Sequence, residues 1–288
     1  MWLEISTNLL KNVNELWSNK HNLKGGKNFM KRRNGILIIA TIFIFSNTLP
    51  ASAANANSTK YQKSYEESYD EYKDDEQFQT MVEDYGVAYG EEFLADVATS
   101  KLLNDPLRGG GGNECYQYVT NVKQTKNYNC GSTTTLQTLY GLNSQSALSG
   151  STNANKISKL DADYNVDSQG SMMVYQVVDA LNKYNIGNQT YIYEEATNMN
   201  LVQFESNIAS SLTYGKPVVL HAKTAYLSYY NGKNTGHYLS LDYVNRTTDK
   251  VRIVDCNNNT SYYGIHTNIP LSEAYDTIHA ESGRYLIY

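Results

Sequence analysis

The sequence lacks the features that several classes of protein require. Outside the first sixty residues it has no long basic run, and its formal net charge is −5, so nothing marks a nucleic-acid-binding surface. No apolar run reaches the ~20 residues that a membrane-spanning helix needs. His, Cys and carboxylate residues do not cluster at metal-ligand spacing, so no metal or other cofactor is expected.

Cysteine is scarce, with three residues in the chain, Cys115, Cys130 and Cys256. In an exported protein an odd number indicates one pair and one free thiol. A disulfide between Cys115 and Cys256 is one candidate pairing, and it would leave Cys130 free. Strand alternation would then turn Cys256 away from the face that Asp255 uses.

A secretory signal peptide is predicted over residues 30–53. It has a basic start at Lys31 to Arg33, an apolar run from Gly35 to Phe45, and small residues at Ala51-Ser52-Ala53 or just beyond for cleavage. The apolar run is too short for a membrane anchor. We therefore expect a secreted protein, extracellular or associated with the cell wall, that has no membrane contact after the signal is removed.

Residues 1–29 precede this signal peptide, which normally begins at the initiator methionine. Lys24-Gly25-Gly26 is how the bacterial ribosome-binding sequence AAGGAGG would read if it were translated, and it lies a few codons before Met30. Residues 1–29 are accordingly interpreted as untranslated upstream sequence, with Met30 as the true start.

Residues 54–112 are predicted to form an acidic, partly helical pro-region. Between residues 57 and 108 there are 13 Asp and Glu against 5 Lys and Arg, and the first part of this segment is typical of a solvated, partly disordered leader. Helical spacing further on indicates one or two amphipathic helices. The apolar residues at this spacing are Phe78, Met81, Val82 and Tyr85, then Leu94, Val97, Ala98 and Leu102.

Four consecutive glycines, Gly109, Gly110, Gly111 and Gly112, end the acidic segment. They break any helix and leave the backbone accessible, as a linker or a cleavage site requires. In the second interpretation the chain is processed at these glycines, and the pro-region covers the cleft as an inhibitor until it is removed.

A helix is predicted from Gly131 to Leu142, with Asn129 as its cap. Cys130 then lies in the first turn, where the helix amides and macrodipole favour an anion and should lower the pKa of the thiol. A buried structural cysteine is the alternative. The residues that share the apolar face of this helix are Leu136, Leu139, Tyr140 and Leu142.

Two alternating segments, residues 236–244 and 251–255, are predicted to form a hairpin around the turn at 245–249. The hairpin brings His237 opposite Asp255 to within a residue or two of register, and opposed Cβ atoms lie ~4.5–5.5 Å apart. A nucleophilic thiol needs a base and a group that orients it, which these two side chains could supply. The alternative is a structural histidine beside a solvated aspartate. His221, in the strand before, is interpreted as a core or surface residue.

Taken in order, these segments resemble the C39-like family of papain-fold cysteine peptidases, from Tyr118 to Ile278. The resemblance implies that residues 113–288 form an α+β domain of papain-like fold, in which a nucleophile helix packs on a twisted antiparallel sheet. The segments that carry it are Gln124, Cys130-Gly131, "GKPVVLHAK" (215–223), "GHYLSLDYV" (236–244) and "VRIVDCNNN" (251–259).

The resemblance also implies a role for each matched residue. Cys130 would be the nucleophile, His237 the general base and Asp255 the group that orients it. Gln124 would stabilise the oxyanion together with the backbone amide of Cys130. Two positions depart from the family, which often has Pro or Ala in place of Ser132 and Pro in place of Cys256.

We therefore expect a secreted cysteine peptidase that hydrolyses a peptide or protein substrate through an acyl-thioester intermediate, with a Gly-Gly preference implied by the family. One alternative is an amidase or transpeptidase that acts on cell-wall peptides with the same triad, although no wall-binding repeat is visible. Another is a non-catalytic secreted binding or toxin-like module that keeps only the fold.

Overall fold

Antiparallel pairing organises the strands into one sheet. The computed structural model describes residues 51–103, 112–187 and 189–288. Within these ranges a seven-stranded sheet runs in the order β2-β7-β3-β4-β5-β6, and β1 pairs with β4. The strands are β1 (Glu114–Tyr116), β2 (Tyr193–Glu195), β3 (Val218–Lys223), β4 (Gly236–Asn245), β5 (Lys250–Asp255), β6 (Gly264–Pro270) and β7 (Tyr285–Ile287).

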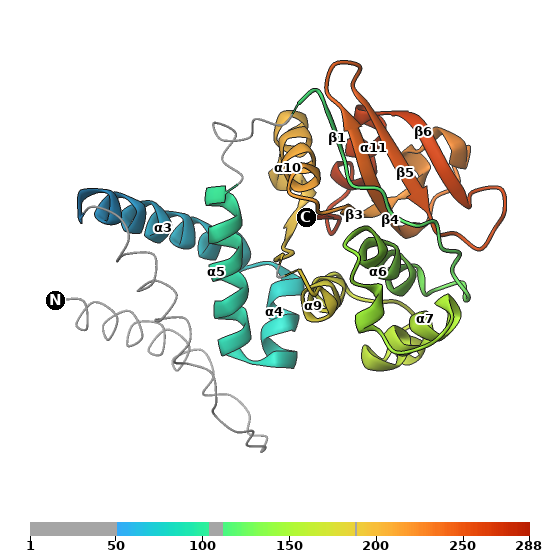
Figure 1. Ribbon diagram of the computed structural model, residues 1–288, viewed down its shortest axis with the longest axis horizontal. Helices are drawn as coiled ribbons and strands as arrows, with labels where there is room; N and C mark the ends of the chain where they lie inside the picture. The colour runs from blue at the N-terminus through green and yellow to red at the C-terminus, as the bar shows by residue number, and fades with distance from the viewer. Residues whose placement is uncertain (1–50, 104–111, 188) are drawn as a thin grey trace. The chain divides into compact units, whose positions relative to one another are not determined.

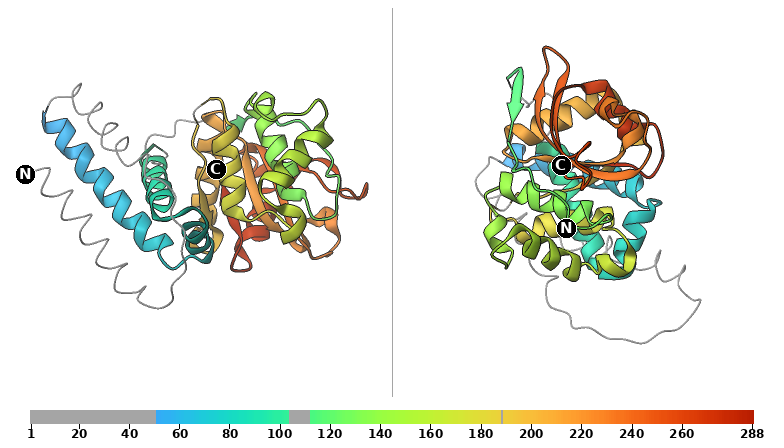
Figure 2. Two further views of the ribbon diagram at one scale, coloured as in Figure 1. Left: turned by 90° about the horizontal axis from the view of Figure 1, so that it is seen from below. Right: turned by 90° about the vertical axis from the view of Figure 1, so that its right-hand side faces the viewer.

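Helices pack against this sheet. Helix α6 contacts β3 and β4, and α7 and α9 contact α6, so these helices lie beside the strands (Figures 1 and 2). Helices α10 and α11 also contact β3. The α-helices are α3 (Ala51–Tyr72), α4 (Glu76–Tyr85), α5 (Val87–Leu103), α6 (Cys130–Gly141), α7 (Asn153–Asp163), α8 (Val166–Gln169), α9 (Val174–Tyr184), α10 (Leu201–Thr213) and α11 (Leu271–His279). This mixture of helices and antiparallel sheet is the α+β class that the sequence predicted.

The predicted hairpin is formed by β4 and β5, joined by a turn at residues 246–249. Ser240 pairs with Val254, which places Asp255 level with Leu239, two residues from His237. Because side chains two residues apart on a strand share a face, His237 and Asp255 still point to the same side of the sheet.

Helix α6 is buried on nearly all sides rather than on one apolar face. Apart from Tyr140 every residue from Cys130 to Gly141 is buried, because β4, α7 and α9 surround the helix. Its polar side chains are satisfied by hydrogen bonds: Thr134 Oγ1 donates to the carbonyl of Tyr238 at 3.1 Å, and Gln137 Oε1 accepts from Ser240 at 3.0 Å. These bonds join the helix to β4.

The first part of the acidic segment, predicted as a solvated, partly disordered leader, forms helix α3 in the structure, and most of its described side chains are exposed or half-buried. Aromatic packing explains the order. Tyr72 is 2% exposed, and its ring lies 5.3 Å from that of Phe93 and 5.4 Å from that of Tyr193 in β2. Phe93 stacks on Tyr193 at 4.8 Å. The two amphipathic helices expected from the spacing are α4 and α5.

Polar contacts add to this attachment. Tyr89 donates to Asp179 of α9 at 2.6 Å, and Tyr285 of β7 donates to Asp75 at 3.2 Å. Residues 50–288 accordingly form one compact unit. None of the helices in the described ranges combines the length and apolar character needed to cross a bilayer.

Several sequence predictions lie outside the described residues. They are the upstream segment 1–29, the signal peptide as far as Pro50, and Gly109, Gly110 and Gly111 of the proposed processing site.

Candidate active site

Cys130 begins helix α6 in a buried position, with 8% of its surface exposed. Asn129 is the N-cap residue of this helix, as the sequence predicted, but its side chain makes no capping bond. Instead its Oδ1 accepts from the N–H of Lys126 at 3.0 Å, and its Nδ2 donates to Asp161 at 3.1 Å. Asn129 therefore fixes the turn before the helix, and the first amides of α6 are left without an acceptor inside the helix.

Gly131 allows α6 to approach its neighbours closely. A Cβ atom there would lie 2.7 Å from the Cβ of Met172 and 3.3 Å from the ring of Tyr238. The hydroxyl of Tyr238 donates to the carbonyl of Met172 at 3.0 Å, and this bond holds Tyr238 and Met172 together. Since Tyr238 follows His237 in β4, the packing around Gly131 sets how far Cys130 lies from His237.

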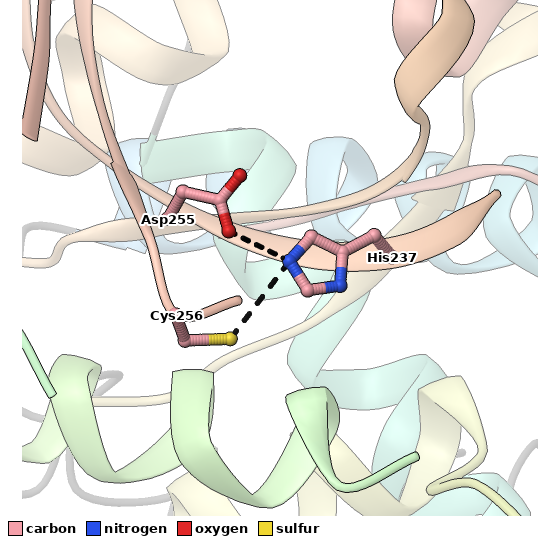
Figure 3. Close-up of side chains that lie close together, drawn as sticks. All are labelled: His237, Asp255 and Cys256. Atoms are coloured by element: carbon pink, nitrogen blue, oxygen red, sulfur yellow. Dashed lines mark hydrogen bonds and ion pairs between the residues drawn. The ribbon is translucent and has the colours of Figure 1, made fainter. Parts of the chain in front are cut away.

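His237 and Asp255 form a buried pair at adjacent strand ends. Nε2 of His237 lies 2.8 Å from Oδ1 of Asp255, and the residues are 4% and 0% exposed (Figure 3). The same Oδ1 accepts from the N–H of Asn257 at 2.8 Å. Oδ2 accepts from the hydroxyls of Tyr229 and Tyr230 at 3.2 and 2.8 Å. The carboxylate is thus held from several directions, and it fixes the orientation of the imidazole in turn.

Tyr229 and Tyr230 are site residues that sequence reasoning missed. They belong to a short 3-10 helix, Ser228–Tyr230, and the chain has 26 tyrosines, so no sequence signal singles them out. Both rings are themselves held by stacking: Tyr229 on His266 at 3.6 Å and Tyr230 on Tyr262 at 4.3 Å.

The side chains of Cys130 and His237 interact, and each shifts the pKa of the other. Burial raises the pKa of the Cys130 thiol, but the interaction with His237, the charge of that imidazole and nearby backbone amides together lower it below its ordinary value. Burial opposes a charge on His237 as well, yet the hydrogen bond to Asp255 and the interaction with Cys130 raise its pKa well above the ordinary value. Both directions favour a thiolate–imidazolium pair.

Cys256 is a third side chain in contact with this pair. Its Sγ lies 4.0 Å from Nε2 of His237 and 3.7 Å from the carbonyl oxygen of Cys130 (Figure 3). Burial raises the pKa of the Cys256 thiol, which favours its protonated form. The prediction that Cys256 turns away from the face of Asp255 is wrong, because β5 ends at Asp255 and strand alternation does not extend further.

The predicted disulfide between Cys115 and Cys256 is not present, and both thiols are free. Cys115 pairs with Val244 of β4, which pairs in turn with Val251 of β5. Cys256 lies five residues beyond Val251, or ~16 Å at ~3.3 Å per residue. A disulfide needs Cα atoms within ~7 Å, so the fold holds these two cysteines too far apart.

Gln124 is held by Cys256, whose thiol also lies 3.7 Å from the carbonyl oxygen of Cys130. The N–H of Gln124 donates to the carbonyl of Cys256 at 2.7 Å, and its Oε1 accepts from the Cys256 thiol at 3.7 Å. The residue is 6% exposed. No acceptor for its Nε2 occurs among the described residues, so this amide group is an unused donor.

The other histidines in the described ranges, His221, His266 and His279, do not join Cys130 and His237. His221 in β3 stacks on Tyr238 at 4.7 Å, and His279 stacks on Tyr275 at 4.5 Å. Nε2 of His266 donates to the carbonyl of Tyr262 at 2.7 Å, and its ring supports Tyr229 by stacking.

Potential metal ligands meet in the site although their sequence spacing did not suggest it. Ligand atoms of His237, Asp255 and Cys256 all lie within 4.8 Å of one another. A nitrogen, an oxygen and a sulfur ligand would suit a soft divalent ion such as zinc. A metal would, however, have to replace the proton between His237 and Asp255 and the proton of the Cys256 thiol.

The described residues thus form an α+β domain with a cysteine at the start of α6 and a buried His–Asp pair at the ends of β4 and β5. Residues 116–282 match the model of the family described as "Peptidase_C39 like family", more than half of the 288 residues, so the chain belongs to this family. The resemblance inferred from the sequence is thereby confirmed, and the family supports peptidase activity. No curated protein matches the chain.

Proposed function

We propose that this protein is a cysteine peptidase that hydrolyses peptide bonds with Cys130 as nucleophile, His237 as general base and acid, and Asp255 as the group that orients His237. The observation that carries this proposal is the position of His237. One ring nitrogen is bound to Asp255 at 2.8 Å, and the same side chain lowers the pKa of Cys130. These are the contacts that an activated thiol and its base require.

The reaction follows from these contacts. The Cys130 thiolate attacks the carbonyl carbon of the scissile peptide, and the protonated His237 gives its proton to the leaving amine. This leaves an acyl-thioester on Cys130. His237, now neutral, takes a proton from water, and the resulting hydroxide attacks the thioester and releases the acid. Because Nε2 is bound to Asp255, we assign the proton transfer to Nδ1.

Gln124 is the proposed oxyanion donor, together with the backbone N–H of Cys130. The support is that Nε2 of Gln124 has no acceptor among the described residues, while its Oε1 is turned toward Cys256. The Cys130 amide lies at the start of α6, where the helix offers no partner. Both donors would meet negative charge that develops only in the transition state.

A fold of the papain type, secretion from Met30 and removal of residues 54–112 at or after Gly109 to Gly112 belong to the same proposal. The glycines suit the Gly-Gly preference implied by the family. The helices of the proposed pro-region, α3, α4 and α5, contact α9, β2 and β7 of the peptidase domain. Sequencing the N-terminus of the secreted protein, from the native chain and from a Cys130→Ala variant, tests secretion, processing and self-processing together.

The thiol is tested directly with a thiol-directed acyl probe at neutral pH. We expect one label per chain, on Cys130, because Cys256 is the protonated thiol of the two in the site. The label should be lost in Cys130→Ala and in His237→Ala but retained in Cys115→Ala. A folded protein that takes up no label would instead support a non-catalytic module, whereas labelling with release of cell-wall peptides alone would support the amidase.

A further inference from the structure

Arg284 is a half-buried cation without an acidic partner in the described part of the chain. It lies just before β7, and its one hydrogen bond to a described side chain runs from Nη1 to Nε2 of His221 at 3.0 Å. Its Nε is buried and makes no hydrogen bond. Glu281, whose charge acts on Arg284, is paired with Lys223 at 3.1 Å. A desolvated guanidinium is costly unless something compensates it, so its position calls for an explanation.

His221 is suited to hold Arg284 without neutralising it. Burial and the charges of Arg284 and Lys223 lower the pKa of His221 to about 3, so the imidazole is neutral and accepts from the guanidinium. A carboxylate in the same place would have quenched the positive charge. A neutral acceptor fixes the side chain and leaves its charge available to a ligand.

Arg284 stands next to the proposed active site. A Cβ atom on Gly236 would lie 3.3 Å from Nη1 and 3.7 Å from Nη2, so the guanidinium contacts the exposed residue directly before His237. His221 stacks on Tyr238, the residue directly after His237, at 4.7 Å. The ring of Tyr238 also packs over Gly131, which follows Cys130. The cation is thus linked by direct contacts to the neighbours of both reacting residues.

We propose that Arg284 binds a carboxylate of the substrate and makes this enzyme selective for an acidic group near the scissile bond. The proposal rests on the proposed peptidase function and adds a substrate class to it. Nη2 and the second N–H of Nη1 form the planar pair of donors that matches a carboxylate in two parallel hydrogen bonds. The carboxylate is either an Asp or Glu side chain or the C-terminus of the substrate.

The test compares matched peptides on the full chain. Each pair carries Asp or Asn at one position, scanned over three residues on either side of the scissile bond, and a second set ends in a free acid or an amide. We expect kcat/KM to favour the acid by about 10- to 100-fold at one position, as a charge-assisted bond would give. In Arg284→Gln this ratio should fall to about 1, and Arg284→Glu should favour Lys at that position.

Lys223→Gln is the matched control, because it removes a neighbouring cation that already has a partner, and it should keep the acid-to-amide ratio. A role of Arg284 in folding alone would change both members of a pair by the same factor. An unchanged ratio in Arg284→Gln would therefore overturn the proposal.

The proposed peptidase function would itself fail if the wild type cleaved none of the peptides in a way that depends on Cys130. This result is distinguishable from a failure of the Arg284 proposal. In that case binding of the same labelled peptides to Cys130→Ala, with and without Arg284→Gln, decides the question by fluorescence polarisation. Tighter binding of the acid that needs Arg284 supports the proposal, and equal binding refutes it.

Discussion

Cys256 lies with its Sγ 4.0 Å from Nε2 of His237, the nitrogen that also binds Asp255. The residue that follows Asp255 is therefore in contact with the proposed base. Its thiol donates to Oε1 of Gln124, so it also fixes the direction in which the Gln124 amide points.

Removing the Cys256 thiol should loosen Gln124 without removing a reacting group. A neutral hydrogen bond contributes about 0.5–1.5 kcal/mol, so Cys256→Ala should lower kcat by about 2- to 10-fold. Cys256→Ser keeps a donor and should lose less. Steady-state kinetics on a peptide substrate measure both variants, and a loss as large as that of Cys130→Ala would show that Cys256 takes part in the reaction itself.

Gln124→Ala should lower kcat by about 10²–10³-fold, the usual effect of losing one oxyanion donor. KM should change less, because the charge that Gln124 would stabilise develops after binding. Labelling of Cys130 by a small alkylating reagent forms no oxyanion and serves as the control. If Gln124→Ala slows alkylation as much as peptide cleavage, the glutamine acts on the thiol and not on the oxyanion.

Asp255→Asn should move the basic limb of the pH profile of kcat/KM to lower pH. The ion pair between the Cys130 thiolate and His237 needs a protonated His237. This ion pair is lost as the pH rises through the pKa of His237. Asp255 is one of the groups that raise this pKa, so its loss lowers the pH at which activity fails. His237→Ala, which removes the base itself, should cost about 10²–10⁴-fold at every pH. An unshifted basic limb in Asp255→Asn would contradict this assignment.

Gly131→Ala should destabilise the protein, because the new Cβ would lie 2.7 Å from that of Met172. Overpacking of this kind costs about 1–3 kcal/mol. Gly112→Ala is the matched control, since a Cβ there meets nothing within 4 Å. Urea unfolding of both variants measures the difference, and equal midpoints would mean that α6 moves away from Met172 freely.

His221 should make the protein sensitive to acid. Its pKa is lowered to about 3 in the folded chain, whereas an unfolded histidine titrates near 6.5. Between these values the unfolded state binds a proton that the folded state does not, so stability falls as the pH drops below about 6.5. At pH 4 the loss is at most about 3 kcal/mol. His221→Gln should lose less between pH 7 and pH 4 in chemical denaturation, and an identical slope would contradict the prediction.

Local patterns in the sequence predicted much of the fold and which residues form the candidate site. The alternation of residues 236–244 and 251–255 and the turn between them gave the hairpin, and the structure brings His237 and Asp255 together within two residues of the expected register. Helical spacing gave α4, α5 and α6. In each case residues that are close in the sequence determine the local structure.

Features that depend on tertiary packing were not predictable in this way. Tyr229, Tyr230 and Arg284 reach the site from a 3-10 helix and from the segment before β7, and nothing near them in the sequence marks them. Cys256 was assigned to the wrong face because the end of β5 is set by its partners. The order in the acidic segment depends on Tyr193 and Tyr285, which lie far along the chain.

The aromatic contacts of Tyr72 and Phe93 with Tyr193 have a consequence for chain cleavage. A cut within the glycines would break one covalent connection but none of these contacts, nor the bonds from Tyr89 to Asp179 and from Tyr285 to Asp75. The nicked protein would therefore migrate as one species on a native gel and as two on a denaturing gel. Maturation would then require dissociation of the two fragments as a second step, with its own rate and its own dependence on temperature and denaturant.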